Sequence, residues 1–218
     1  GGIEFLGKKM SDYPARERAR KRSVVRQDPL PLPAFSVREY VRMGFFPHEG
    51  FWSISRPGRN DELDSILADM DLVHLGDRTL DSISGGEMQR AHLARAIAQS
   101  GRILLLDEPV SHLDMHHAHD IMNYLYELNG RGATVVAVLH DINLASSWCG
   151  RIIGIRDGRI VADGTPSRVF RRDVLRLIFD MDFSVIKNPS SGKPAVFPVT
   201  LKGPSVSRKR IVSDRIKR

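Results

Sequence analysis

The spacing of hydrophobic positions along the chain changes at about Ser82. After that point, stretches with helical spacing alternate with two short continuous apolar runs, at residues 103–106 and 134–139. Runs of this kind are typical of strands buried on both faces, and their alternation with helices indicates a mainly parallel α/β sheet. Asp157-Gly158 lies between two further short apolar stretches and predicts a hairpin, which we expect to form an antiparallel edge of that sheet.

Two helices are predicted between these strands. The first follows Ser84 and carries an apolar stripe formed by Met88, Ala91, Ala94 and Ile97. The second follows Asp114, and Gly130 is its predicted stop. Its apolar face consists of Ala118, Ile121, Met122, Leu125 and Leu128.

The chain before Ser82 has a different texture. Residues 2–10 predict a short strand, residues 11–14 a polar turn, and the basic run 16–26 a charged helix face, because Ala15 and Ala19 have helical spacing. A proline-spaced segment begins at Pro29 and precedes two amphipathic helices, the second of which we expect to be capped by Asn60 or Asp61. Their apolar faces are Val37, Tyr40 and Val41 in one, and Leu63, Ile66, Leu67 and Met70 in the other.

Composition and charge narrow the class of protein. The chain has 218 residues, 41% of them hydrophobic, and its single cysteine, Cys149, has no partner for an internal disulfide. Its apolar runs are too short to cross a bilayer, so a membrane role is expected to be peripheral. Residues 202–218 carry seven Lys and Arg against one Asp, which is most of the net charge of +7. Because this tail has no aromatic residue for base stacking, we expect no specific nucleic-acid binding.

Two adjacent acids, Asp107 and Glu108, follow the apolar run 103–106. Ligands of doubly wound sheets bind at the carboxyl ends of the strands, so both carboxylates are expected to reach a crevice. Adjacent side chains on a strand face opposite ways, which leaves one carboxylate for a metal and the other for a water molecule. The alternative, an acidic helix start, explains one acid more readily than two.

The most specific stretch is Ile-Ser-Gly-Gly-Glu-Met-Gln-Arg at residues 83–90. Ser84 can cap a helix, and the two glycines allow backbone N–H groups to approach an anion at the positive helix end. Standing before a strand that ends in Asp-Glu, the stretch resembles the signature motif of ABC ATPases, and Asp107-Glu108 resembles their Walker B element. The resemblance covers residues 1–199 and implies an α/β, P-loop NTPase-like fold with a mainly parallel sheet and a helical subdomain.

The resemblance also implies roles for individual residues. Glu108 orients or deprotonates the attacking water and Asp107 holds Mg²⁺. ATP is contacted by Ser84, Gly85, Gly86, Glu87 and, in the D-loop Ser111-His112-Leu113-Asp114, by Asp114.

Two further positions match the family. His140 resembles the switch histidine that contacts the γ-phosphate, although a structural histidine is the better interpretation of His140 taken alone. Gln27 resembles the catalytic Q-loop glutamine, which contacts Mg²⁺ and links the nucleotide site to the helical lobe. A competing metal site at His112, His116 and His119 has no cysteine or acidic cluster to complete it.

A phosphate-binding loop is not expected in the chain. Residues 2–9 nearly fit its pattern, but Lys9 stands where the pattern has a metal-binding hydroxyl. The negative charge of Glu4 would repel the phosphates, and Tyr13-Pro14 interrupts the helix that should follow. Gly192-Lys193 is a turn before Pro194. The segment 2–10 instead resembles the strand and turn after a phosphate loop, so we expect the fold to be N-terminally truncated and the 218-residue chain to hydrolyse ATP negligibly.

The resemblance implies four regions and a set of partners. The regions are the remnant of the ATP-binding core (1–27), the helical subdomain (28–82), the core with the signature and Walker B elements (83–200), and a basic tail (201–218). We expect a homodimer that binds two ATP molecules at the cytoplasmic face of the inner membrane. Its permease partners would dock on the helical subdomain, and a substrate-binding protein would act indirectly. The aromatic residues Phe45, Phe46, Phe51 and Trp52 fit either this docking surface or the core.

Details in five segments resemble the ATPases of importers for ferric siderophores, haem or vitamin B12. The segments are residues 84–87, 139–145, 157–161, 164–166 and 188–198. Other transport systems, and an ABC-derived remnant that no longer hydrolyses ATP, stay open as alternatives. A chromosome-maintenance ATPase is excluded because the proline-containing segment before Ser84 cannot form a long coiled coil.

Overall fold

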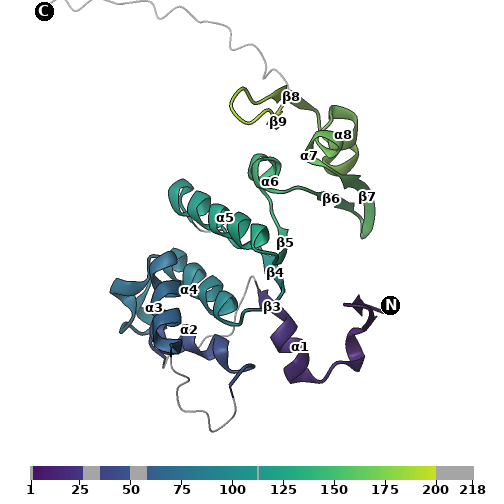
Figure 1. The fold of residues 1–218 in the computed structure, drawn as a ribbon. Helices are drawn as coiled ribbons and strands as arrows, with labels where there is room; N and C mark the ends of the chain where they lie inside the picture. Colours follow the sequence, from purple (N-terminus) through teal and green to yellow (C-terminus); the bar gives the residue numbers. More distant parts are fainter. Residues whose placement is uncertain (1, 27–34, 50–57, 112, 200–218) are drawn as a thin grey trace, which may run out of the picture. The chain divides into compact units, whose positions relative to one another are not determined.

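The computed structural model describes residues 2–26, 35–49, 58–111 and 113–199 (Figure 1). The chain divides into two compact units, Gly1–His140 and Asp141–Arg218. This division falls inside the region 83–200 that the sequence suggests, so the four-region scheme stays a prediction. None of the described helices is both long and apolar enough to cross a lipid bilayer.

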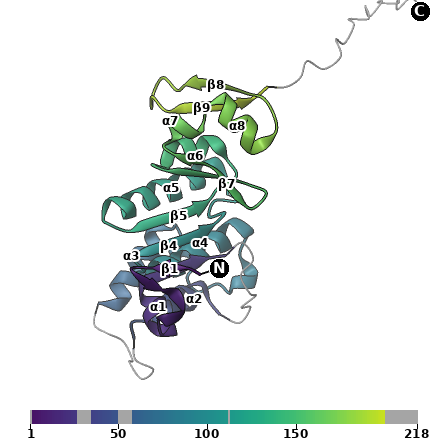
Figure 2. The same ribbon diagram turned by 90° about the vertical axis from the view of Figure 1, so that its right-hand side faces the viewer.

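A three-stranded parallel sheet with the order β3-β4-β5 forms the centre of the first unit (Figure 2). Its strands are β3 (Arg22–Val25), β4 (Ile103–Asp107) and β5 (Thr134–Val138). In the register, Leu106 of β4 lies beside Val25 on one side and Ala137 on the other. The predicted parallel arrangement of the two apolar runs is confirmed, and the shared direction brings the carboxyl ends of all three strands to one edge.

Two predictions about these strands are wrong. The charged helix expected at 16–26 ends at Lys21 as α1 (Ala15–Lys21), and β3 follows directly, because pairing with β4 outweighs the helical pattern of the basic residues. β5 was expected to be buried, yet Val136 and Val138 are each 53% exposed. Within the described part of the first unit, β5 is an edge strand and one of its faces is not covered.

Helices of the first unit pack together beside the sheet (Figure 1). They are α2 (Val37–Arg42), α3 (Arg59–Asp69) and α4 (Gly85–Ala98), joined by the short 3₁₀ segments η2 (Met43–Phe45), η3 (Val73–Leu75) and η4 (Leu80–Ser82). The apolar faces predicted for α2 and α3 are buried. The cap predicted for α3 is wrong: Gly58 is the N-cap, and Asn60 and Asp61 lie in the first turn, where an acid favours the helix dipole.

The fifth helix, α5 (Met115–Gly130), begins at its predicted cap, Asp114. The helix ends at its predicted stop, Gly130, and the left-handed residue Gly132, with φ +99°, follows the cap residue Arg131. The Gly132 N–H donates to the carbonyl of Asn129 at 2.9 Å, and the Ala133 N–H donates to that of Leu128 at 3.1 Å. This pair of bonds is a Schellman motif, which requires a residue with positive φ one position beyond the cap.

The N-terminal segment is a hairpin rather than the single strand predicted. Strands β1 (Glu4–Phe5) and β2 (Lys8–Lys9) pair antiparallel through a turn at Leu6-Gly7, where both φ angles are positive, and η1 (Met10–Asp12) follows. The Lys8 ammonium lies 4.2 Å from the centroid of the Tyr13 ring. Lys8 thus lies in a strand of a hairpin and not at the start of a helix.

The second unit contains the predicted Asp157-Gly158 hairpin, with φ +50° and +72° at the turn. Its strands β6 (Ile152–Arg156) and β7 (Arg159–Gly164) form a sheet of their own, so the prediction that they extend the parallel sheet is wrong for the described residues. A second hairpin, β8 (Phe183–Lys187) and β9 (Pro194–Pro198), encloses the predicted turn at Gly192-Lys193. The helices are α6 (Ile142–Trp148), α7 (Pro166–Val169) and α8 (Arg172–Phe179).

We predict that Gly44→Ala lowers the free energy of unfolding by about 1–3 kcal/mol, which is the usual cost of overpacking. Gly44 lies in η2, where an added Cβ would stand 2.3 Å from the Arg95 carbonyl oxygen and 2.7 Å from the Ala98 Cβ of α4. Urea unfolding measures the change. The control is Gly130→Ala, whose added Cβ meets nothing within 4 Å, and which should raise the free energy of unfolding slightly. Equal effects of the two substitutions would contradict the close approach of η2 to α4.

We also predict that the first unit loses stability as the pH falls from about 6.5 to 4. His92 is buried in α4, its Nδ1 lies 2.7 Å from the Tyr40 hydroxyl, and burial lowers its pKa to about 4. Because the unfolded histidine takes up its proton near pH 6.5, the unfolded state binds more protons throughout this window, which destabilises the fold as the pH falls.

Between pH 6.5 and 4, the free energy of unfolding of the parent should fall by about 3 kcal/mol more than that of His92→Asn. Urea unfolding at each pH measures it. His116→Asn is the control, because that histidine is exposed and should leave the pH dependence nearly unchanged. Parallel pH profiles for the parent and His92→Asn would contradict the lowered pKa.

Candidate functional site

The described residues of the first unit include all the predicted site residues except Gln27, which lies outside them. Two groups can be distinguished. One gathers at the end of β4 around Asp107 and Glu108, and the other lies where α4 and α5 begin. His112 also lies outside the described residues.

The backbone of Glu108 turns sharply at the end of β4, with φ +49°. A left-handed conformation is unfavourable for a residue with a side chain, and the following Pro109 restricts the backbone further. Hydrogen bonds hold the turn: the Glu108 N–H donates to the Val138 carbonyl at 3.2 Å, and the Glu108 carbonyl accepts from Ser111 N–H at 3.2 Å and from Ser111 Oγ at 2.9 Å. The strain is therefore offset by bonds to two other segments.

Sequence reasoning missed a residue that takes part in this turn. The Gln89 side chain is buried and its Nε2 donates to the Glu108 carbonyl at 3.1 Å. Gln89 belongs to α4, so the bond ties the signature helix to the residue that follows β4. The only available sign in the sequence was a glutamine on an otherwise apolar helix face, since such a residue needs a polar partner when it is buried.

The Glu108 carboxylate faces His140, and its Oε1 accepts a hydrogen bond from His140 Nε2 at 2.6 Å. The Glu108 side chain is 16% exposed, whereas that of His140 is 78% exposed. The two residues follow neighbouring strands, because Asp107 of β4 lies beside Val138 of β5. A largely enclosed carboxylate beside an accessible imidazole is an arrangement that can orient a water molecule and move a proton.

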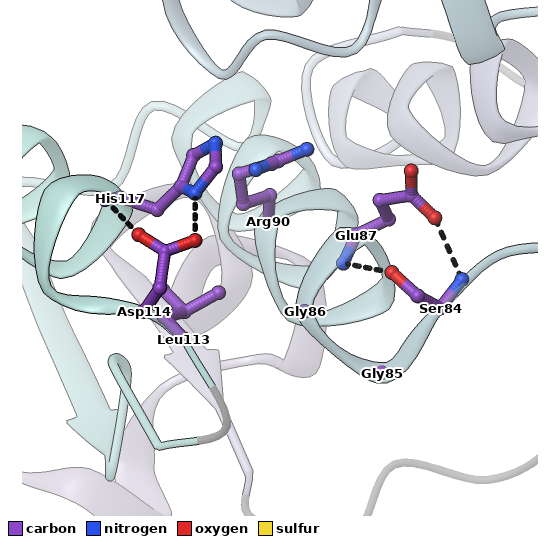
Figure 3. A pocket seen from close by; sticks show the side chains of 8 residues that line it. All are labelled: Ser84, Gly85, Gly86, Glu87, Arg90, Leu113, Asp114 and His117. Atoms are coloured by element: carbon purple, nitrogen blue, oxygen red, sulfur yellow. Dashed lines mark hydrogen bonds and ion pairs between the residues drawn. The ribbon is translucent and has the colours of Figure 1, made fainter.

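The start of α4 forms a capping box around Ser84 (Figure 3). Ser84 Oγ accepts from the Glu87 N–H at 3.3 Å, and the Ser84 N–H donates to Glu87 Oε2 at 2.7 Å. The Ser84 backbone N–H is the main reason that the pKa of Glu87 is lowered. The predicted cap is confirmed, and the Gly85 Cα faces open space, since an added Cβ would meet nothing within 4 Å.

The start of α5 is capped in a similar way by Asp114. Its Oδ1 accepts from the His117 N–H at 3.0 Å, and its Oδ2 accepts from His117 Nδ1 at 2.6 Å (Figure 3). The His117 backbone N–H, followed by its ring, lowers the pKa of Asp114 to about 2. Asp114 is therefore ionised under ordinary conditions.

A cavity of about 540 Å³ lies between the starts of these two helices (Figure 3). The side chains of Arg90 and His117 line it, and both were missed by sequence reasoning. The N–H groups of two helix N-termini and the Arg90 guanidinium can attract an anion there, while the carboxylates of Glu87 and Asp114 in the same lining oppose it. The full lining is Ser84, Gly85, Gly86, Glu87, Arg90, Leu113, Asp114 and His117.

The histidines of α5 have other partners than a metal ion. His116 Nδ1 lies 3.1 Å from Asp120 Oδ2 on the exposed surface of the helix, and His117 is bonded to Asp114. Within the described ranges of the chain, no group of three His, Cys, Asp or Glu side chains is placed to hold a metal ion. Asp107, at the end of β4, still offers the carboxylate oxygen that Mg²⁺ prefers when the other ligands are phosphates and waters.

Comparisons of the sequence point to one family. The sequence profile of the ABC transporter family matches residues 1–111. The ferric enterobactin transport ATP-binding protein FepC of Escherichia coli is 33% identical over 208 residues, which cover 95% of this chain and 77% of FepC. The hemin import ATP-binding protein HmuV of Gloeobacter violaceus is 37% identical over 208 residues, which cover 91% of this chain and 74% of HmuV.

Solved structures agree on the fold. A metal-chelate type ABC transporter in an inward-facing conformation gives a TM-score of 0.72 at 23% identity, covering 83% of this chain and 72% of that chain. The dimeric ATP-binding cassette MJ0796, bound to ADP and phosphate, gives 0.69 at 30% identity, covering 76% of this chain and 73% of that chain. These matches confirm the predicted P-loop NTPase-like fold, and the chain belongs to the ABC transporter family.

Proposed function

We propose that this chain is the ATP-hydrolysing subunit of an importer for a ferric siderophore or haem. The observation that carries the proposal is the contact between Glu108 and His140, at 2.6 Å, on a backbone turn that is strained and held by hydrogen bonds. The names of the relatives FepC and HmuV support the class of substrate. The similarity of the chain to both supports the same direction of transport.

The chemistry follows from where Glu108 lies. A water molecule beside its carboxylate would attack the γ-phosphorus of ATP, forming a new P–O bond while the bond to the leaving ADP oxygen breaks. The proton of that water passes to the Glu108 carboxylate, which His140 holds in place, and the exposed His140 ring would contact the phosphate. Since Glu108 is mostly enclosed and its backbone is fixed, the carboxylate is oriented before ATP arrives.

Mg²⁺ fits the donor set at this edge of the sheet. Asp107 would hold it, and the ion would neutralise charge that develops on the phosphate oxygens. Gln27, the second predicted ligand, follows β3 along the chain after Arg26. We propose that Gln27 contributes to the same ion and links it to the helical region.

The cavity at the start of α4 and α5 provides the second half of a site. We propose that Ser84, Gly85, Gly86, Glu87 and Asp114 contact an ATP molecule held by a second copy of this chain, so that ATP closes a homodimer and hydrolysis opens it. Support comes from the two helix N-termini that border the cavity, whose N–H groups can contact phosphate, and from the dimeric form of MJ0796.

The helical region supplies a candidate docking surface for a permease. Phe45 is buried in the core, whereas Phe46 beside it is 61% exposed. Phe51 and Trp52 lie outside the described residues. We propose that Phe46 and its surroundings contact the membrane-embedded subunits from the cytoplasmic side, and that a substrate-binding protein acts through those subunits.

Turnover is measured on the chain joined to an N-terminal phosphate-loop segment, called the extended chain below. We predict that Glu108→Gln in the extended chain lowers ATP turnover at least about 100-fold while leaving ATP binding intact, because the amide keeps the shape and loses the basic carboxylate. Dimers with trapped ATP should accumulate. The control is Glu127→Gln, which removes an exposed carboxylate of α5 and should leave turnover unchanged.

Turnover of Glu108→Gln near that of the parent would exclude Glu108 as the base. An extended chain that binds ATP but never hydrolyses it, with or without the substitution, would favour an ABC-derived remnant.

We predict that Ser84→Arg in the extended chain abolishes turnover while each subunit still binds nucleotide. The arginine obstructs the entrance of the cavity, and the lost cap costs only about 1 kcal/mol, too little to unfold the domain. The matched control is Ser36→Arg, because Ser36 and Glu39 form the same capping box on α2, where they do not line the cavity.

A heterodimer tests whether the site is shared between subunits. Mixing Ser84→Arg with Glu108→Gln gives one site that combines both lesions and one site that has an intact Glu108 and an intact Ser84. Turnover should therefore return in the mixture, although neither homodimer is active. No recovery in a demonstrated heterodimer would contradict a shared site.

A further inference from the structure

We propose that Asp71 and His117 are positioning residues that join the ends of three helices and thereby fix the walls of the cavity between α4 and α5. The proposal deepens the proposed function, on which its turnover arm rests, because the cavity is there assigned to the nucleotide of a second subunit. Neither residue is expected to contact the reacting atoms.

Asp71 occupies a backbone position that normally selects glycine. It follows α3 with φ +52°, and the Schellman bonds of that helix end run from the Asp71 N–H to the Ala68 carbonyl at 3.0 Å and from the Leu72 N–H to the Leu67 carbonyl at 2.7 Å. A side chain is unfavourable in this conformation, although aspartate tolerates it better than most residues. Asp180 shares this conformation, so the role proposed for Asp71 rests on the groups that its carboxylate faces.

The Asp71 carboxylate faces groups from two other helices. Its Oδ2 lies 3.8 Å from Arg90 Nη2 of α4 and 3.9 Å from His117 Nε2 of α5. Its Oδ1 lies 3.8 Å from the exposed His74. Arg90 and His117 both line the cavity, so a single acid stands behind two of its walls.

Arg90 needs this acid more than an exposed arginine would. Its side chain is only 8% exposed, and its Nε is buried without a hydrogen-bond partner in the described structure. A buried guanidinium is costly unless a counter-charge stands nearby. The charge of Asp71 therefore favours the observed position of Arg90, which lies within the first two turns of α4.

His117 extends the connection to the cap of α5. Its Nδ1 donates to Asp114 Oδ2 at 2.6 Å, and its Nε2 lies 3.9 Å from Asp71 Oδ2, which it attracts when that nitrogen also carries a proton. The ring thus stands between the acid that ends α3 and the acid that begins α5 (Figure 3 shows the Asp114 side). Moving α5 relative to α3 would break this chain of contacts, so the bridge fixes where Asp114 stands at the edge of the cavity.

The substitution Asp71→Gly separates positioning from stability. Glycine relieves the left-handed backbone, which offsets part of the cost of removing the exposed Asp71 carboxylate from the buried Arg90 guanidinium, so the midpoint of urea unfolding should fall only slightly. Turnover of the extended chain should nevertheless fall about tenfold, with ATP binding by the single subunit unchanged. In the 218-residue chain itself, the amides of His117 and Ala118 should exchange with solvent faster.

Asp180→Gly is the matched control. Asp180 also ends a helix, α8, in a left-handed conformation, with φ +58°. Asp180→Gly should relieve the same backbone conformation without changing turnover or amide exchange at the start of α5. Equal turnover in Asp71→Gly and Asp180→Gly would overturn the proposal.

A double-substitution cycle tests the bridge. His117→Asn keeps an amide that can donate to Asp114 but cannot reach Asp71, and it should lower turnover about as much as Asp71→Gly. The double variant should be no worse than the more impaired single variant, since both remove the same contact. If turnover of the double variant instead falls about 100-fold, the product of the two single effects, the residues act independently and the bridge is overturned.

His116→Asn is the control for the histidine, because its ring pairs with Asp120 on the outer surface of α5. The exchange measurement needs no ATP, so it keeps the two proposals distinguishable. Unchanged amide exchange at His117 and Ala118 in Asp71→Gly would overturn the bridge, whatever the turnover. If exchange is faster in this variant but the extended chain shows no turnover even without a substitution, only the proposed function is overturned.

Discussion

The candidate catalytic centre depends on the backbone of one residue, Glu108. Its left-handed conformation directs the chain out of β4 and leaves the carboxylate facing His140. The conformation is unfavourable in itself, so it persists only because neighbouring segments bond both of its backbone groups. Those segments are β5, the turn at Ser111, and α4 through Gln89. A change in any of them therefore reaches the carboxylate without touching it.

The helix α4 has two functions in this arrangement. Its first turn, capped by Ser84, forms one wall of the cavity, and Gln89, five residues further on, holds the carbonyl of Glu108. A helix is stiff over such a short distance, so a displacement of its first turn is transmitted to the turn after β4. This gives a physical connection between the surface assigned to the partner's nucleotide and the carboxylate assigned to the subunit's own.

The parts of the fold that were predictable are those in which local chemistry and tertiary structure agree. Ser84 and Asp114 are good caps in isolation and are caps in the structure, and the apolar run 103–106 is a strand in either context. The clearest failure was decided by a tertiary contact. A strand at Arg22–Val25 exists because β4 offers a partner, which a basic sequence does not reveal. The cap of α3 and the turn at Leu6-Gly7 were missed for a local reason, because each depends on a residue with positive φ.

The sequence singled out candidate site residues but not the residues that support them. Asp107, Glu108 and His140 stand out because they follow two apolar runs whose carboxyl ends meet at one edge of the sheet, and the structure places Glu108 and His140 in contact. Gln89, Arg90, Asp71 and His117 carry no such signal, since each is an ordinary residue for a helix or a helix end. Among them, Asp71 shares with Glu108 a left-handed backbone that its residue type does not favour. Glycine at either position would fold with less strain and would lack the carboxylate. The carboxylate of each of these two acids faces groups of other elements, His140 for Glu108 and Arg90 and His117 for Asp71.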